Sequence, residues 1–149
     1  MSFYFDASAL LALLLNEPSA EYVERFMRRH DQTISVSTLC LAECSAAISG
    51  LVRMGRRSEA EVTTLLQRLD DWIDIFGDRV AILDTDVEDA CGLVRRLDLK
   101  LRTPDAIHIA AARRLNARLI TLDHPMAQAA SLLNLDCINP ADTAGEMKD

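Results

Sequence analysis

Short apolar segments of strand length alternate with longer helical segments along the whole chain. The expected strands cover residues 3–5, 34–36, 80–83, 119–122 and, more weakly, 136–138. The expected helices cover residues 7–15, 19–30, 38–54, 58–76, 85–97, 104–115 and 125–133. This alternation is typical of an α/β sandwich around a mostly parallel sheet. Because no repeat or linker interrupts it, we expect one domain over residues 1–149, with a polar tail after about residue 140.

Two of the helix starts carry the spacing of a capping box, in which a hydroxyl residue is followed three positions later by an acid. Ser58 with Glu61 has this spacing before one helix, and Thr85 with Glu88 has it before the next. We therefore expect both pairs to fix the first turns of their helices.

The helix expected after Thr103 is the most apolar of the chain. Thr103 can cap it, and Pro104 suits its first turn, where a missing N–H costs nothing. Residues 106–112 are all apolar except His108, so this helix is predicted to be buried on nearly every side. Asp105 lies in the first turn, at the positive end of the helix dipole. By itself an acid in this position is commonly a simple cap, and a functional role requires other carboxylates nearby.

Composition and charge limit the compartment and the partners. There is no uninterrupted apolar run of about 18 residues, so we expect no membrane span, and without an export signal we expect a cytoplasmic protein. The four cysteines lie in apolar segments and are expected to be buried, reduced thiols. A formal charge of −7 argues against a generally basic surface, and any RNA contact would need a local arginine groove.

Four carboxylates are placed so that the predicted fold can bring them together. Asp6 and Asp123 follow the first and fourth expected strands, and sites in open parallel sheets form beyond the carboxyl ends of strands. Asp105 opens the helix that leads into the fourth strand. Glu43 lies on a helix face of small and apolar residues, where an unpaired carboxylate would be costly. Several such acids without arginine partners close in sequence are best explained by a hard divalent cation.

The sequence resembles the PIN-domain ribonucleases, and within them the VapC-type toxins of prokaryotic toxin–antitoxin pairs. The resemblance covers nearly the whole chain and is carried by FDASAL at 5–10, by STL at 37–39 with AE at 42–43, by LRTPDAIHIA at 101–110 and by LITLD at 119–123. It implies a PIN-like three-layer sandwich with a five-stranded parallel sheet in the order 3-2-1-4-5.

The same resemblance implies a function, a cofactor and partners. It implies an endoribonuclease that depends on Mg²⁺ or Mn²⁺, forms homodimers and is inhibited by a small antitoxin. The family's acids correspond to Asp6, Glu43, Asp105 and Asp123, which are the expected catalytic residues and metal ligands, and Ser8 corresponds to a small hydroxyl residue near the metal. Together these features predict the toxin of a type II pair, hydrolysing RNA phosphodiester bonds with a metal-activated water.

Two other functions remain open from the sequence. A phosphorylatable receiver-like switch would use Asp84 after the third strand, but it needs a lysine after the fifth strand, where only Lys148 of the tail is available. A catalytically silent PIN-like interaction module is also possible, although the presence of all four acids counts against it.

Three further assignments are left as alternatives. His108 is either a core histidine with satisfied hydrogen bonds, which we favour, or a metal ligand. The arginines at 53, 56 and 57, and those at 25, 28 and 29, are either solvated helix ends or RNA contacts. An apolar dimer interface is expected on the helix over 58–76 or on the helix over 38–54. Trp72 and Phe76 are its candidate anchors, although Trp72 can equally be buried within one monomer.

Overall fold

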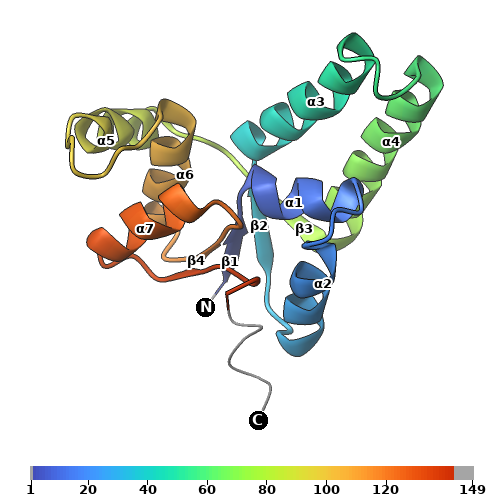
Figure 1. Cartoon of the computed structure of the whole chain (residues 1–149). Coiled ribbons are helices and arrows are strands. Elements are labelled where there is room, and N and C mark those ends of the chain that lie inside the picture. The colour runs from blue at the N-terminus through green and yellow to red at the C-terminus, as the bar shows by residue number, and fades with distance from the viewer. Residues whose placement is uncertain (1, 143–149) are drawn as a thin grey trace.

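The computed structural model describes residues 2–142 and centres on a parallel sheet in the order β3-β2-β1-β4-β5 (Figure 1). The strands are β1 (Phe3–Phe5), β2 (Ile34–Ser37), β3 (Gly77–Val80), β4 (Arg118–Ile120) and β5 (Cys137–Ile138). The helices are α1 (Ala7–Leu14), α2 (Ala20–Arg29), α3 (Thr38–Arg53), α4 (Glu59–Phe76), α5 (Asp84–Val94), α6 (Thr103–Arg114) and α7 (His124–Leu132). The sheet and its strand order confirm the fold that the resemblance implied.

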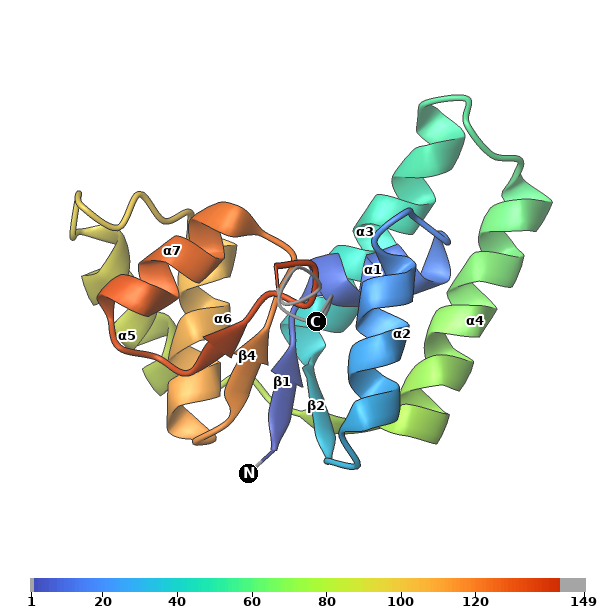
Figure 2. The same cartoon turned by 60° about the horizontal axis from the view of Figure 1, so that its bottom comes forward.

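Helices cover both faces of the sheet and give the molecule three layers. Helices α1 to α4 lie on one side and α5 to α7 on the other, as Figure 2 shows. Side chains of β1 alternate between the two resulting cores: Phe3 and Phe5 pack with the first layer of helices, and Tyr4 packs with the second. Because both faces are covered, β1 is apolar at every position and reads as a continuous hydrophobic segment.

Strand β3 lies earlier in the chain than predicted. The apolar run 80–83 was expected to form it, but residues Gly77–Val80 pair with β2 instead. The strand is at the edge of the sheet, so Asp78 and Arg79 can remain exposed there. Ile82 of the predicted strand packs into the second hydrophobic core as part of the connection to α5. The prediction was wrong because an edge strand does not need an apolar sequence.

Strand β4 ends before the predicted position. It stops at Ile120, and the following residues turn toward Asp6 at the carboxyl edge of β1. The Thr121 N–H still donates to the Ile138 carbonyl at 3.1 Å, so one hydrogen bond to β5 extends past the last residue of β4. Asp123 is therefore three residues beyond the strand, where it caps α7.

The predicted capping box of α4 is confirmed. The Ser58 hydroxyl accepts from the Glu61 N–H at 3.2 Å, and the Glu61 carboxylate accepts from the Ser58 N–H at 2.8 Å. Each side chain therefore satisfies one backbone donor that the first turn leaves open.

The box predicted for α5 is wrong. The helix begins at Asp84, one residue before Thr85, and the carboxylate of Asp86 accepts from the Leu83 N–H at 2.9 Å. Asp86 is held in place by Arg114 of α6, whose Nε and Nη2 lie 2.8 and 2.9 Å from its two oxygens. A tertiary ion pair thus decides which acid closes the first turn.

The start of α6 also differs by one residue. Thr103 was expected to cap the helix, but it lies in the first turn, and Arg102 is the N-cap residue without a side-chain capping bond. Pro104 occupies the first turn as predicted. The shift leaves Asp105 as the third helical residue, in the first turn of α6.

The expectation of four buried, reduced cysteines is confirmed in part. All four cysteines are free, but only Cys40 and Cys44 are buried, while Cys91 is exposed and Cys137 is half-buried. None of the helices within residues 2–142 combines the length and apolar character needed to cross a membrane. Most of the predicted polar tail, residues 143–149, lies outside the described part of the chain.

Candidate active site

Asp6 occupies the N-cap of α1 at the carboxyl end of β1 and is only 2% exposed. Its Oδ1 accepts from the Ser8 hydroxyl at 2.7 Å and from the Ala9 N–H at 3.1 Å, and its Oδ2 accepts from the Thr121 hydroxyl at 2.6 Å. Burial raises the pKa of Asp6, although all three donors act in the opposite direction. The carboxylate is therefore firmly oriented, yet its charge is incompletely compensated.

Asp105 lies in the first turn of α6 and is 7% exposed. Arg102 donates from Nε to its Oδ2 at 3.2 Å, but the arginine side chain is 78% exposed. Burial raises the pKa of Asp105, the guanidinium of Arg102 lowers it, and the negative charge of Asp123 raises it further. The net shift is upward, so an exposed arginine does not neutralise this site.

Asp123 is half-buried at the N-cap of α7. Its Oδ1 accepts from the Met126 N–H at 3.0 Å, and its own N–H donates to the Thr121 hydroxyl oxygen at 3.0 Å. Thr121 in turn donates to Asp6, so a single hydroxyl joins two of the predicted acids. Asp123 thus serves as a helix cap and also adds to the negative field at Asp105.

Glu43 lies on α3, about one and a half turns from its start, with its side chain 32% exposed. The small, apolar face on which it lies is less buried than expected, because Ala46 and Ala47 on the next turn are exposed. Its Oε1 is hydrogen-bonded to Nε2 of His108. Glu43 is therefore a partnered carboxylate that faces the edge of the sheet.

His108 is 1% exposed and has a partner at each ring nitrogen, which is the hydrogen-bonded core histidine that we favoured. Nδ1 lies 2.8 Å from the hydroxyl oxygen of Tyr4, and this hydroxyl donates its proton to Ser37 at 2.9 Å. Burial raises the pKa of Tyr4, which is fully enclosed. A polar chain thus runs from Ser37 through Tyr4 and His108 to Glu43.

Hydrogen bonds and electrostatic interactions connect the four predicted acids in part. His108 contacts Glu43 and influences the pKa of both Asp6 and Asp105, while Asp123 influences that of Asp105. However, no three His, Cys, Asp or Glu side chains among residues 2–142 are close enough to surround one ion. Asp105 is turned toward Arg102, and Glu43 is turned toward His108.

The chemistry of these donors fits a hard divalent cation. All four acids offer carboxylate oxygens, the ligands that Mg²⁺ and Mn²⁺ prefer. The raised pKa values of Asp6 and Asp105 show that negative charge there lacks sufficient compensation, which a cation would provide. In this structure, however, Asp105 is hydrogen-bonded to Arg102 and Glu43 to His108.

Comparison with known proteins identifies the family. The family model of the PIN domain matches residues 3–132. The chain belongs to the PIN domain family. Ribonuclease VapC46 of Mycobacterium tuberculosis is 34% identical to it over 145 residues, covering 93% of this chain and 97% of that protein.

Solved structures share the PIN fold at lower sequence identity. VapBC2 from Rickettsia felis, bound to a DNA fragment from its promoter, has a TM-score of 0.70 at 18% identity. A toxin–antitoxin complex from Klebsiella pneumoniae has a TM-score of 0.66 at 19% identity. Each match covers 93% of this chain and 98% of the other chain. The receiver-like alternative is excluded by this family membership and by the exposed position of Asp84 on α5, away from the end of β3.

Sequence reasoning missed two residues that hydrogen-bond to the candidate site, Thr121 to Asp6 and Tyr4 to His108. Thr121 was expected only as part of a strand, and Tyr4 only as part of an aromatic strand. The signal for Tyr4 was its position between Phe3 and Phe5, which places it on the opposite face of β1, where a buried hydroxyl needs a partner. The signal for Thr121 was weaker, because only tertiary contact brings it to Asp6.

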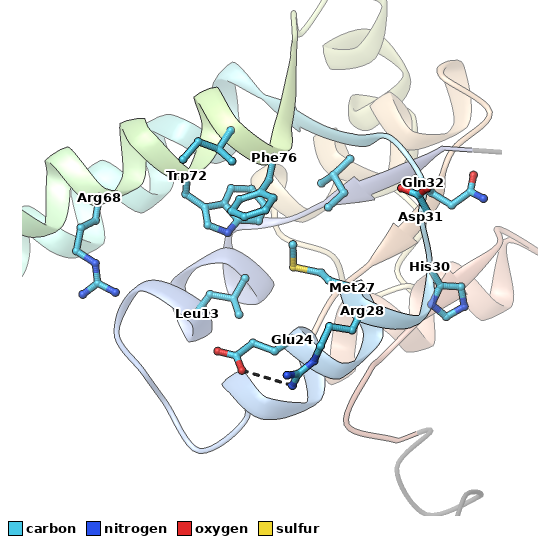
Figure 3. Close-up of a pocket in the computed structure, with 12 residues that line it drawn as sticks. Leu13, Glu24, Met27, Arg28, His30, Asp31, Gln32, Arg68, Trp72 and Phe76 are labelled. Carbon is cyan, nitrogen blue, oxygen red and sulfur yellow. Dashed lines mark ion pairs between the residues drawn. The ribbon is translucent and has the colours of Figure 1, made fainter.

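A separate groove of about 700 Å³, lined by both apolar and charged side chains, lies at the amino end of β2, the opposite end of the strands from the acids (Figure 3). Leu13, Met27, Trp72 and Phe76 line it, and Glu24 pairs with Arg28 at 3.8 Å on its rim. Trp72 stacks on Phe5 with ring centroids 6.0 Å apart, so much of it is used within the monomer. Phe76 remains 52% exposed and is the stronger candidate for an interface.

Proposed function

We propose that this PIN domain is an endoribonuclease that depends on Mg²⁺ or Mn²⁺ and acts in the cytoplasm as the toxin of a type II toxin–antitoxin pair. One observation carries the proposal: Asp6 and Asp105, both buried and both with raised pKa values, lie at the carboxyl edge of the sheet. The relationship to a protein named as a ribonuclease, at 34% identity, gives this acidic site its substrate class.

Asp6, Glu43, Asp105 and Asp123 would hold the ion. When bound, a divalent cation supplies polarisation of the phosphoryl group and a lowered pKa for the attacking water. Ser8 and Thr121 donate to Asp6, as does the Ala9 N–H, so the carboxylate keeps one acceptor site, on Oδ2, for an ion. Both hydroxyls also accept backbone N–H groups, of Leu122 and Asp123, which fixes the loop after β4 against α1.

The histidines of the chain favour hydrolysis over attack by the neighbouring 2′-hydroxyl, which requires a general base and a general acid. His30 bonds to the Phe26 carbonyl at 2.9 Å, far from the acids in the fold, and His108 is enclosed. Only His124 is exposed beside Asp123. In the route that we propose, water attacks phosphorus in line, the bond to the 3′-oxygen breaks, and the products are a 5′-phosphate and a 3′-hydroxyl.

The partners follow from the same assignment. The structure from Klebsiella pneumoniae is a toxin–antitoxin complex, and we propose that a small antitoxin also inhibits this chain. A guanidinium of the antitoxin can bind the carboxylates bidentately and compete with the metal. We further propose a homodimer that uses the exposed apolar residues of α4.

Mass spectrometry of the products from a short oligoribonucleotide tests the function. The expected ends are 5′-phosphate and 3′-hydroxyl, formed with Mg²⁺ or Mn²⁺ and absent in EDTA. The Asp105→Asn variant, purified in parallel, controls for contaminating nucleases. Cyclic phosphate ends formed in EDTA would contradict the mechanism. Absence of cleavage of any RNA by the metal-loaded protein would favour the silent interaction module.

A further inference from the structure

His108 is placed to orient the side chain of Glu43. A carboxylate offers only acceptors, so Nε2 of His108 must carry a proton to form its bond to Oε1. The other ring nitrogen lies 2.8 Å from the Tyr4 hydroxyl, which fixes the plane of the ring. The imidazole is 1% exposed and cannot rotate without losing both bonds inside the core. The proton on Nε2 is therefore presented in one fixed direction.

Glu43 by itself would not be held in one orientation. Its side chain is 32% exposed, and its neighbours Ala46 and Ala47 are too small and too exposed to restrict it. A free glutamate of this kind occupies many rotamers, and ordering it opposes metal binding by an entropy cost. The bond from His108 removes that freedom before an ion arrives.

The bond also joins two layers of the molecule. Helix α3 packs into the first hydrophobic core through Cys40, Cys44 and Ile48, whereas α6 packs into the second core. His108 is on α6, so its bond to Glu43 crosses the carboxyl edge of the sheet between the two layers. Asp105 is one helical turn from His108 on the same helix. The bond therefore holds the carboxylate of Glu43 in a defined position relative to Asp105.

We infer that His108, supported by Tyr4, is a positioning residue that preorganises Glu43 for the divalent cation of the site. This inference rests on the proposed function. His108 does not touch the ion, and its contribution passes through the carboxylate of Glu43. Partners that orient metal ligands commonly change metal affinity by about tenfold to a hundredfold when removed.

The test measures Mn²⁺ affinity by titration calorimetry on the whole chain without RNA, together with the melting temperature in metal-free buffer. His108→Leu removes both bonds, while Tyr4 keeps its bond to Ser37. We expect about a tenfold weaker affinity. His108→Gln can still donate to Glu43 from its amide, and its affinity should stay within about threefold of the parent. His30→Gln, a histidine outside the site, is the matched control and should leave affinity unchanged.

A double-mutant cycle separates positioning from a purely structural role. If His108 acts through Glu43, His108→Leu should have no further effect on Mn²⁺ affinity in a Glu43→Gln background. Additive losses in the two variants would overturn the inference, as would an unchanged affinity in folded His108→Leu. Should His108→Leu fail to fold, Tyr4→Phe decides in its place: it should weaken Mn²⁺ binding about twofold to threefold, and an unchanged affinity would overturn the inference. Absence of Mn²⁺ binding by the parent protein would instead overturn the proposed function.

Discussion

At the scale of single residues, the acids of this PIN domain differ in how far their charge is compensated. Asp6 accepts three hydrogen bonds but forms no ion pair with another residue of 2–142, and Asp105 has an arginine partner that is mostly in solvent. Both have raised pKa values because burial outweighs these contacts. Asp86 has the opposite shift, since Arg114 binds both of its oxygens. This difference supports the assignment of Asp6 and Asp105 to the proposed site and of Asp86 to a structural role.

Asp105→Asn should abolish RNA cleavage, by at least about a hundredfold, without weakening the fold. The ionised carboxylate disfavours the folded state at neutral pH, because its pKa is higher folded than unfolded, and the amide removes that penalty. The melting temperature in metal-free buffer should equal or exceed that of the parent. Asp84→Asn, an exposed first-turn aspartate on α5, is the matched control and should keep full activity. Full cleavage by Asp105→Asn would disprove the site.

Arg102→Gln should strengthen Mn²⁺ binding by about twofold to fivefold, a size typical of exposed ion pairs. The guanidinium of Arg102 competes for the Asp105 oxygen that an ion would use. Calorimetry without RNA is the appropriate measurement, since it excludes any effect of Arg102 on RNA. Arg96→Gln is the control, because Arg96 pairs with Asp98 in an exposed position outside the site. Weaker binding by Arg102→Gln would mean that the arginine supports the metal site.

At the scale of the elements, α6 connects the candidate site to the second layer of helices. It carries Asp105 and His108 at the edge of the sheet, and at its other end it carries Arg114. Arg114 binds Asp86 of α5 and also donates to the Ala81 carbonyl at 2.9 Å. This clamp holds the connection from β3 to α5 against α6.

Asp86→Asn should reduce the free energy of unfolding by about 2 kcal/mol at pH 7, because it leaves the guanidinium of Arg114 without its charged partner. The folded pKa of Asp86 is below its unfolded value. The stabilisation is therefore present above a pH of about 4 and is lost as the pH falls through the folded pKa. Urea unfolding at several pH values should show the difference from the parent shrinking in acid. The exposed Arg96–Asp98 pair provides the control, and Asp98→Asn should leave the midpoint unchanged. A pH-independent loss in Asp86→Asn would contradict this assignment.

At the scale of the whole molecule, the two ends of the sheet have different surfaces. The acids gather at the carboxyl end of β1, whereas the groove with Phe76 opens at the amino end of β2. The arginines at 53, 56 and 57 are exposed around the turn after α3, and Arg53 is about 15 Å along that helix from Glu43. Whether they contact RNA stays a prediction.

Phe76→Asp should convert a homodimer into a monomer. Phe76 and its neighbour Ile75 are 52% and 71% exposed at the end of α4, and an exposed apolar pair of this kind is suited to an interface core. Light scattering over a range of concentrations should give a dimer mass for the parent and a monomer mass for the variant. Leu97→Asp, which charges an 86% exposed leucine on the second layer, should remain dimeric. A parent mass equal to one chain at every concentration would rule out the dimer.

The amino-acid sequence by itself determined the alternation of strands and helices and the placement of Asp6 and Asp105. Both follow from local physics, namely apolar runs that must be covered and acids at helix starts. The sheet order came from the family resemblance. That Asp6 and Asp105 bind an ion stays a prediction, as do the roles of Glu43 and Asp123.

The tertiary structure alone decided three other features. The position of β3 depends on pairing with β2, because an edge strand can be polar and local hydrophobicity does not locate it. The first turn of α5 depends on Arg114, which is 28 residues away from Asp86. The partner of Glu43 is His108, 65 residues further along the chain, and only the packing of α3 and α6 on opposite layers brings the two side chains together at the edge of the sheet. Such contacts have no local signature, because their energy comes from groups that meet only after the layers have formed.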